Sequence, residues 1–279
     1  MDTSLVRRKL PLLAALLAAA ALAFSPAQAA AQTGVEQEFV GFTTSNVQLL
    51  YGWNFNDNLL GYDPPSREMM TLTFNNFTEW KYGDSFFFAD LQSGNKINSS
   101  GQNASLYAEW HPRVFVNRII GQKTPLLGFI RNYGAAFEVN QGAGFQAYMA
   151  GAGMDFEMPG YMNIGFNFYW RYSAIVSNVF TQFQHTWQFS PFWTIPFKTG
   201  PVPWVFTGFL DMFPNPDGQL DIMTQPQLLV DVLGLAGGKG NRLYLGCEWY
   251  IHSYQNVFPN APTRKTVSAP QLMVQWTIH

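Results

Sequence analysis

Apolar and polar residues alternate with a period of two along much of the chain after residue 45. Residues 162–171 read MNIGFNFYWR, with Met162, Ile164, Phe166, Phe168 and Trp170 at every second position. Because successive side chains of a β-strand point to opposite faces of the sheet, this pattern predicts a strand with one apolar and one polar face. Four further segments, at 46–55, 70–75, 243–252 and 271–278, alternate in the same way.

Weaker alternation predicts further strands near residues 85–92, 104–115, 129–140, 145–157, 180–190, 202–212 and 220–232. Turn-forming sequences such as Tyr82-Gly83-Asp84, Met158-Pro159-Gly160 and the glycine-rich residues 237–241 separate the segments. Together they make about twelve strands, an even number as in bacterial single-chain barrels. Pro226 and Pro270 fall inside candidate strands. A proline has no N–H for the hydrogen-bond ladder, so we expect these strands to start later or to bulge there.

Composition decides which face meets solvent. The chain is 47% hydrophobic and 16% aromatic but only 12% charged, against about 25% charged residues in a typical soluble domain. No stretch after residue 30 is long and apolar enough for a membrane helix. We therefore predict an all-β fold, a transmembrane antiparallel up-and-down β-barrel of about 12 strands whose apolar face contacts the lipid bilayer. The alternative, a soluble β-sandwich or small secreted barrel, would need more charge on its wet face.

The N-terminus predicts export. Residues 7–9 are basic, residues 10–24 are apolar, and Ala27-Gln28-Ala29 fits a cleavage site. This order is that of a secretory signal peptide. We predict a cleaved signal peptide at 1–29, a short N-terminal extension at 30–45 and the barrel at 46–279. A barrel exported in this way belongs in the outer membrane of a Gram-negative bacterium, where the barrel-assembly machinery inserts it.

Charge and cysteine content remove other classes. A net charge of −2 without a basic stripe argues against nucleic acid as a partner. The single cysteine, Cys247, permits no internal disulfide and no cysteine-based metal cluster, and its parity puts it on the lipid-facing side. We expect no cofactor and no metal.

Function in a barrel depends on the inward set of side chains. Parity assigns to it Thr73, Asn75, Phe77, Glu79, Lys81, Phe86, Phe88, Asp90, Gln92, Tyr107, Glu109, His111, Arg113, Asn167, Tyr169, Arg171, Thr207, Phe209, Asp211, Tyr244, Glu248, Tyr250 and His252. Aromatic rings stack on flat heterocycles, at about 1–3 kcal/mol per base. Carboxylates, amides and arginines can hydrogen-bond the hydroxyls of a sugar. Several weak sites in a row suit transport, because the solute must also leave. The alternative is that the inward charges only pair with one another and fill the barrel.

The sequence gives little support for an enzymatic function. No Gly-x-Ser-x-Gly or His-Glu-x-x-His motif is present. Ser253 and His252 are neighbours on a predicted strand and so face opposite sides. Glu248 and His252 share a face, but positions four apart on a strand are roughly 13 Å from each other. We predict that the chain is not an enzyme.

Several segments resemble one protein family. Residues 71–92, reading TLTFNNFTEWKYGDSFFFADLQ, residues 106–114, reading LYAEWHPRV, residues 148–171 and the C-terminal TVSAPQLMVQWTIH are similar to the Tsx/OmpK family of nucleoside-specific outer-membrane channels. Glu109, Pro112 and Arg113 match the family's E-x-x-P-R pattern. Within 148–171 the positions in register are Gly151, Gly153, Asp155, Pro159, Asn167 and Tyr169. The sequence departs from the family at His111, where a second carboxylate is expected, and at the terminal His279, which replaces an aromatic residue.

The resemblance implies a monomeric twelve-stranded barrel that admits nucleosides by facilitated diffusion through a narrow lumen. By this resemblance, the residues that contact the solute would be Phe77, Glu79, Phe88, Asp90, Glu109 and Arg113, followed by Tyr169 and Arg171. Parity adds Tyr107, Glu248 and Tyr250 to the predicted track. Two alternatives stay open: a general small-solute pore, and a surface barrel that acts through its loops. A barrel that hydrolyses lipid is the less favoured third.

Overall fold

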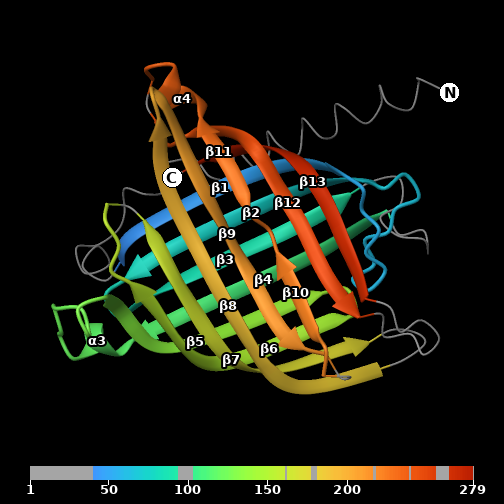
Figure 1. Ribbon diagram of the computed structural model, residues 1–279, viewed down its shortest axis with the longest axis horizontal. Helices are drawn as coiled ribbons and strands as arrows, with labels where there is room; N and C mark the ends of the chain where they lie inside the picture. The colour runs from blue at the N-terminus through green and yellow to red at the C-terminus, as the bar shows by residue number, and fades with distance from the viewer. Residues whose placement is uncertain are drawn as a thin grey trace, which may run out of the picture. The chain divides into compact units, whose positions relative to one another are not determined.

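The computed structural model describes residues 40–93, 103–160, 162–176, 181–215, 218–238, 240–255 and 264–278. Thirteen strands form a single antiparallel sheet in which β1 pairs with β13, so the sheet closes on itself (Figure 1). The strands are β1 (Val40–Trp53), β2 (Glu68–Trp80), β3 (Gly83–Ser93), β4 (Ala104–Phe115), β5 (Ile130–Gly142), β6 (Phe145–Phe156), β7 (Asn163–Val176), β8 (Thr181–Thr199), β9 (Val202–Pro214), β10 (Leu220–Thr224), β11 (Gln227–Asp231), β12 (Leu243–Gln255) and β13 (Arg264–Thr277).

Two of the thirteen strands occupy a single strand position in the wall, one after the other. Both β10 and β11 lie between β9 and β12, and their pairing with each neighbour continues in one register from Leu220 to Asp231. The ladder is interrupted only at Gln225 and Pro226. The barrel therefore has twelve strand positions, which confirms the predicted fold class and the predicted break at Pro226.

Pro270 behaves differently from the expectation. It lies inside β13, opposite Trp249 of β12, and the register of that pair runs on through it without a shift. The other neighbour, β1, pairs with β13 only from Gly52 opposite Gln271 onward. Pro270 is the residue just beyond that pairing. Its missing N–H therefore costs no bond in this part of the ladder, and the strand neither starts later nor bulges.

The barrel wall begins earlier than expected. β1 starts at Val40, so residues 40–45, expected to belong to an N-terminal extension, are part of the wall. The predicted signal peptide and the terminal His279 lie outside the described residues. Below, the terminal end of the barrel is the end at which β1 begins and β13 ends, and the loop end is the opposite end, which carries the β1–β2 loop.

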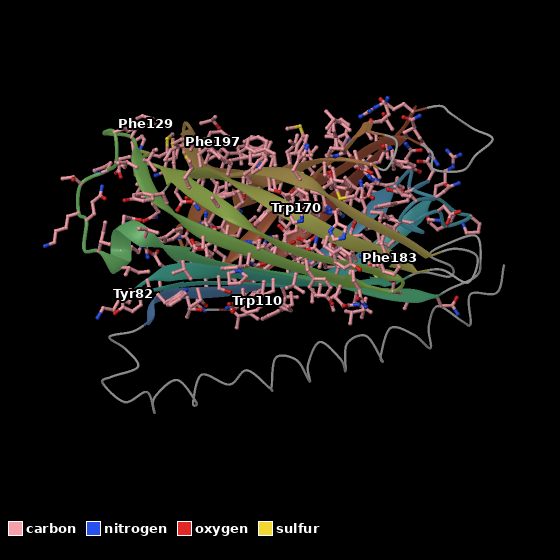
Figure 2. The ribbon with its side chains drawn as sticks, turned by 90° about the horizontal axis from the view of Figure 1, so that it is seen from below. Tyr82, Trp110, Phe129, Trp170, Phe183 and Phe197 are labelled. Carbon is pink, nitrogen blue, oxygen red and sulfur yellow. The ribbon has the colours of Figure 1, made fainter. Side chains whose placement is uncertain are left out.

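The outer face of the wall is apolar and aromatic. Figure 2 shows such side chains, Trp110, Trp170, Phe183 and Phe197 among them, along the flank of the barrel. Others on the strands are Leu49, Tyr51, Trp53, Leu91, Leu106, Phe137, Tyr148, Phe168, Trp187, Phe206, Leu228, Leu245, Trp249, Leu272, Val274 and Trp276, all exposed. The free Cys247 is also exposed. A continuous apolar exterior of this extent belongs to a barrel that faces lipid.

Alternation separates the two faces sharply. On β7, Trp170 is 63% exposed, whereas its neighbour Tyr169 is 0% exposed. In the same way, Trp249 and Leu272 are exposed, whereas their sequence neighbours Glu248 and Gln271 are buried. The strand pattern predicted for residues 162–171, 243–252 and 271–278 is confirmed.

One polar patch interrupts the outer face at the terminal end. Asn76 and Thr78 of β2 lie beside Thr43 and Ser45 of β1. All four side chains are on the outer face of the wall, as Leu49 is on β1. Asn76 Nδ2 lies 3.0 Å from Ser45 Oγ, and the Thr43 and Thr78 hydroxyls lie 3.0 Å apart. The four side chains satisfy one another, which lowers the cost of their position outside the barrel.

Helices are a minor part of the described chain. α3 (Val116–Ile119) and α4 (Val232–Leu235) each cover a single turn between two strands. Among the residues described, no helix has the length and hydrophobicity to cross a bilayer.

The outward position of Phe168 gives a test of this wall. Phe168→Arg should reduce the free energy of folding into lipid by about 2–4 kcal/mol, because a charged side chain would have to enter hydrocarbon. Ala143→Arg, at an exposed position in the β5–β6 turn, is the matched control and should change it little. Equilibrium denaturant titration in lipid vesicles measures both, and equal tolerance of the two changes would contradict the assignment of faces.

Candidate functional site

The interior of the barrel holds three polar groups of side chains at successive levels. The terminal-end cluster is Asp84, Arg113, Arg118, Asn132 and Asp155. The middle cluster is Glu109, His111, Glu138, Asn140 and Arg171. The loop-end brace is Asp57, Asp221, Tyr250 and His252. Their level follows from their position along the strands, since β3 and β12 begin at the terminal end and β4 begins at the loop end.

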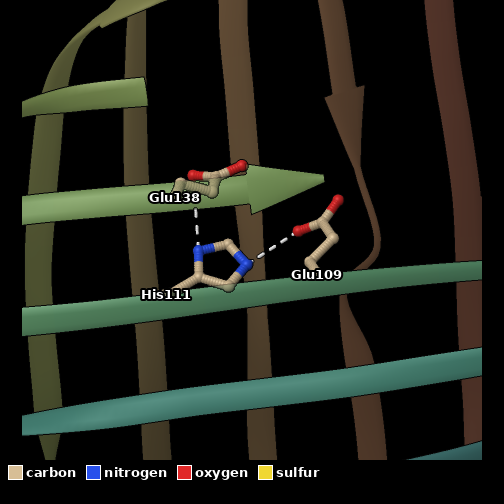
Figure 3. A group of neighbouring side chains, drawn as sticks. All are labelled: Glu109, His111 and Glu138. Atoms are coloured by element: carbon tan, nitrogen blue, oxygen red, sulfur yellow. Dashed lines mark hydrogen bonds and ion pairs between the residues drawn. The ribbon is translucent and has the colours of Figure 1, made fainter. Parts of the chain in front are cut away.

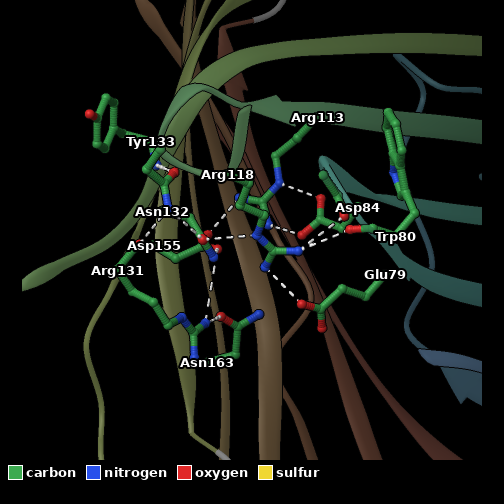
Figure 4. A network of polar contacts seen from close by, with 12 residues as sticks. Glu79, Trp80, Asp84, Arg113, Arg118, Arg131, Asn132, Tyr133, Asp155 and Asn163 are labelled. Atoms are coloured by element: carbon green, nitrogen blue, oxygen red, sulfur yellow. Dashed lines mark hydrogen bonds and ion pairs between the residues drawn. The ribbon is translucent and has the colours of Figure 1, made fainter. Parts of the chain in front are cut away.

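Arg113 organises the terminal-end cluster (Figure 4). Its Nη2 donates to Asp84 Oδ2 at 2.5 Å and its Nη1 to Asp155 Oδ1 at 2.7 Å, and all three side chains are less than 10% exposed. The guanidinium also lies 5.0 Å from the ring centroid of Phe115 and 4.9 Å from that of Phe192. Two carboxylates and two rings therefore hold one buried cation, an arrangement typical of structure more than of a site that changes partners.

A more exposed ion pair borders this cluster. Arg118 Nη2 donates to Glu79 Oε1 at 2.7 Å, and the Glu79 side chain is 43% exposed. Asn132 Nδ2 donates to Asp155 Oδ2 at 2.9 Å. The terminal end is thus closed by a continuous polar network in which nearly every charge is paired.

Within the middle cluster, Glu109, His111 and Glu138 join the neighbouring strands β4 and β5 (Figure 3). His111 Nε2 lies 2.8 Å from Glu109 Oε2, and His111 Nδ1 lies 3.3 Å from Glu138 Oε2. Tyr107 donates its hydroxyl to Glu109 Oε1 at 2.5 Å, and Asn140 Nδ2 donates to the same oxygen at 3.2 Å. Glu109 lies opposite Asn140 in the register of β4 and β5, so the pairing of these strands brings the cluster together.

A row of aromatic rings follows the same level of the wall. The ring centroids of Phe86 and Phe88 are 6.0 Å apart, those of Phe88 and Tyr107 are 6.0 Å apart, and those of Tyr107 and Phe145 are 6.4 Å apart. The Arg171 guanidinium lies 5.8 Å from the Phe145 ring centroid. We call Phe86, Phe88, Tyr107 and Phe145 the ring row.

Several buried polar atoms near the ring row have unused hydrogen-bonding capacity. Among the described residues, Glu138 Oε1, Asn140 Oδ1, Asn167 Oδ1, Tyr169 Oη and Arg171 Nε are buried without a hydrogen-bond partner. They come from β5 and β7, the two neighbours of β6. A buried polar atom without a partner costs about 1–3 kcal/mol. Their gathering at one level marks a place where a polar solute or water gains hydrogen bonds.

Three further interior carboxylates hydrogen-bond to neutral side chains. The pairs are Asp90 with Thr73 at 2.5 Å, Asp211 with Ser190 at 2.6 Å, and Glu248 with Gln227 and Gln271 at 2.6 Å each. Together with the middle cluster, this gives the interior more carboxylates than cations at this level.

The loop end is narrowed by the β1–β2 loop. Phe55 and Tyr62 of this loop lie among interior side chains of β12 and β13, in an apolar group with Met69, Tyr250, Tyr254, Val267 and Ala269. The ring centroids of Phe55 and Tyr250 are 5.6 Å apart. The loop thus folds into the barrel instead of extending away from it.

Asp57 fastens this loop to the wall. Its carboxylate accepts the Tyr250 hydroxyl at 2.5 Å and lies 2.5 Å from His252 Nδ1, while His252 Nε2 lies 2.8 Å from Asp221 Oδ1. Burial by itself would raise the pKa of Asp57, but the attraction of His252 and the hydrogen bonds from His252 and Tyr250 hold that pKa below its ordinary value. The loop-end brace therefore depends on an ionised Asp57.

All the residues predicted for the solute track lie on the inner face, but at different levels. Phe88, Tyr107, Glu109, Tyr169 and Arg171 gather in the middle, with Asp90 and Glu248 near them, whereas Arg113 and Glu79 belong to the terminal end and Tyr250 to the loop end. Phe77 lies opposite Phe86 of the ring row in the register of β2 and β3, and its ring centroid is 6.3 Å from that of Phe42. Their role in binding a solute stays a prediction.

Two kinds of interior residue were missed from the sequence. Glu138 and Asn140 share the inward parity of Asn132 within 129–140, so the alternation of that segment could have revealed them. Asp57 lies in a loop, and the sequence carries no signal for its bond to His252. The expectation that His252 and Ser253 face opposite sides is confirmed, since Ser253 Oγ contacts Thr266 and Arg264 instead.

A closed barrel with an apolar exterior and an interior of rings, carboxylates and arginines defines a transmembrane β-barrel. The chain belongs to the family described as "Domain of unknown function (DUF5020)", whose model matches residues 44–278. No curated protein matches the chain in sequence.

Solved structures of several outer-membrane proteins are similar at a distance. A bacterial polysaccharide outer membrane secretin is 8% identical with a TM-score of 0.38, over 84% of this chain and 98% of that one. The β-domain of the Bordetella autotransporter BrkA is 7% identical with a TM-score of 0.34, over 84% and 98%. OpdK of Pseudomonas aeruginosa, solved with vanillate, is 9% identical with a TM-score of 0.27, over 86% and 99%. Similarity this distant carries no argument about function.

The buried position of Arg113 makes its loss costly. Arg113→Met should lower the free energy of folding by about 3–5 kcal/mol, because Asp84 and Asp155 would be left buried without their cation. Glu79→Gln should cost less than about 1 kcal/mol, because the Glu79–Arg118 pair is partly exposed. Denaturant titration in vesicles compares them, and a loss of equal size would show that the terminal-end cluster is not held by Arg113.

Proposed function

We propose that the protein is a monomeric outer-membrane channel that lets nucleosides, or similar small neutral solutes, diffuse through a narrow lumen. The proposal assigns the chain no catalytic step. The apolar exterior supports the membrane location, and the predicted N-terminal signal peptide supports export to the outer membrane.

The middle of the barrel carries the proposal. The ring row lies at the level of the buried polar atoms that lack a partner, on Glu138, Asn140, Tyr169 and Arg171. A nucleoside has both kinds of complementary group, a flat base that stacks on rings and hydroxyls that hydrogen-bond. Interior charges that only filled the barrel would satisfy one another, as those around Arg113 do.

The charge of the interior supports a neutral solute. The carboxyl groups of Asp90, Asp211 and Glu248 hydrogen-bond to neutral side chains, so these positions offer a phosphate group no cation to pair with. A nucleoside should therefore pass where the corresponding nucleotide does not.

The dense interior favours a narrow path over a general pore. Tyr169, Arg171 and Glu109 of the middle level are all nearly inaccessible, and the β1–β2 loop occupies the loop end. A wide water-filled pore would leave such inward side chains exposed. We infer that solutes pass after the loop has moved away from the brace.

Conductance measurements in lipid bilayers test both which solute the channel binds and which residues contact it. Nucleosides should block the current at millimolar concentration or below, and nucleoside monophosphates should not. Phe88→Ala should weaken this block about tenfold to a hundredfold, because a stacking contact of about 1–3 kcal/mol is lost.

Phe87→Ala is the matched control, since Phe87 precedes Phe88 in β3 and has the opposite parity. It should leave the block unchanged. A current that no nucleoside blocks, with sugars passing freely, would favour a general pore instead.

Loop release gives a second test. Asp57→Asn should raise the open probability of the channel, because the brace to His252 and Tyr250 loses its charge. Acid should act in the same direction. The pKa of Asp57 is lowered in the fold, so the brace is intact at neutral pH and is lost only as the pH falls through that lowered value, below the ordinary pKa of an aspartate.

Single-channel recordings at neutral pH compare the variant with Asp63→Asn, a change in the same loop outside the brace. An Asp57→Asn channel that stays closed as often as the wild type would rule out this loop as the gate.

A further inference from the structure

We propose that Glu109, His111 and Glu138 form a binding site for a divalent transition-metal ion in the barrel interior. One donor atom from each of the three side chains lies within 4.8 Å of the other two. The site goes beyond the proposed channel and does not depend on which solute passes.

The geometry of the three donors fits a single ion. Zinc bonds to nitrogen and carboxylate oxygen are about 2.0–2.2 Å long, which places neighbouring tetrahedral ligands about 3.4 Å apart. His111 Nε2 lies 2.8 Å from Glu109 Oε2, and the other ring nitrogen, Nδ1, lies 3.3 Å from Glu138 Oε2. Figure 3 shows the carboxylate of Glu109, on the same strand as His111, and that of Glu138, on the neighbouring strand β5, on either side of the imidazole. One imidazole nitrogen can bind the ion after a small rotation of these side chains.

A second observation points to a ligand at the same place. Glu138 is 1% exposed and Asn140 is 6% exposed, yet Glu138 Oε1 and Asn140 Oδ1 have no hydrogen-bond partner among the described residues. Asn140 Nδ2 donates to Glu109 Oε1, so its amide lies within the cluster. Two buried oxygens with unused lone pairs are what a cation would satisfy, and Asn140 can supply a fourth ligand.

The loop-end brace provides an internal comparison. His252 also lies between two carboxylates, those of Asp57 and Asp221. Both histidines contact one carboxylate through each ring nitrogen. Among the described residues, however, only the side chains around His111 bring one donor atom each to within 4.8 Å of the other two. The donors around His111 are therefore grouped more tightly than those of the brace.

The donor set selects a class of ion. One imidazole nitrogen with carboxylate and amide oxygens suits first-row divalent ions such as Zn²⁺, Fe²⁺ and Mn²⁺, whereas soft ions such as Cu⁺ prefer sulfur. The hydrogen bond from Arg171 Nη1 goes to Ser173 Oγ and its guanidinium lies 3.9 Å from the Phe213 ring centroid, so Arg171 does not occupy the donor atoms of the three side chains.

Titration of the full mature chain in detergent with Zn²⁺, followed by calorimetry, tests the site. We expect one Zn²⁺ per chain, and Co²⁺ in its place should give the visible absorption of a four-coordinate nitrogen and oxygen site. His111→Asn and Glu138→Gln should each weaken binding at least about tenfold. His252→Asn, which removes a histidine held between two other carboxylates, should leave the affinity unchanged.

Circular dichroism and resistance to SDS establish that each variant is folded. Weak binding of several ions, or binding that survives both His111→Asn and Glu138→Gln, would show an adventitious ion only and overturn the site. Equal loss in His252→Asn would overturn it too. None of these outcomes bears on nucleoside block, so the site and the channel can fail separately.

Discussion

Closure of the hydrogen-bond ladder is the constraint on which the rest of this structure depends. In hydrocarbon an unpaired backbone N–H or C=O costs several kcal/mol, so a sheet that spans a membrane must pair its first strand with its last. Here β1 meets β13, and even the break at Pro226 leaves the register intact. Closure fixes which side chains point inward, because each strand alternates between the two faces. Polar side chains that would be wet on an open sheet are thereby confined to a small interior.

The confined polar side chains form two kinds of arrangement. Around Arg113 they satisfy one another and stiffen the terminal end. At the middle level the small or aromatic character of the neighbouring residues leaves atoms such as Glu138 Oε1 and Tyr169 Oη without partners. This difference separates structural filling from a place where solutes or ions can bind. The loop held by Asp57 adds a closure that does not involve the wall itself.

The sequence predicted the wall better than it predicted the contacts inside. Strong contrast between neighbours, as between Tyr169 and Trp170, identifies strand and face together, because burial follows the period of two. Glu138 escaped notice because glycine and alanine at the neighbouring inward positions of β5 weaken that contrast. The bond from Asp57 to His252 could not be predicted, since it joins a loop to a strand 195 residues away and no local pattern encodes that distance.

One surface of this wall meets lipid, and the other encloses a polar lumen. Spin labels at successive positions of β7, in a chain in which Cys247 is replaced by serine, measure this directly through their collisions with oxygen and with a water-soluble nickel reagent. Oxygen accessibility should rise at positions 168 and 170 and fall at 167 and 169. Equal accessibility at neighbouring positions, or greater nickel than oxygen accessibility at 168 and 170, would contradict it.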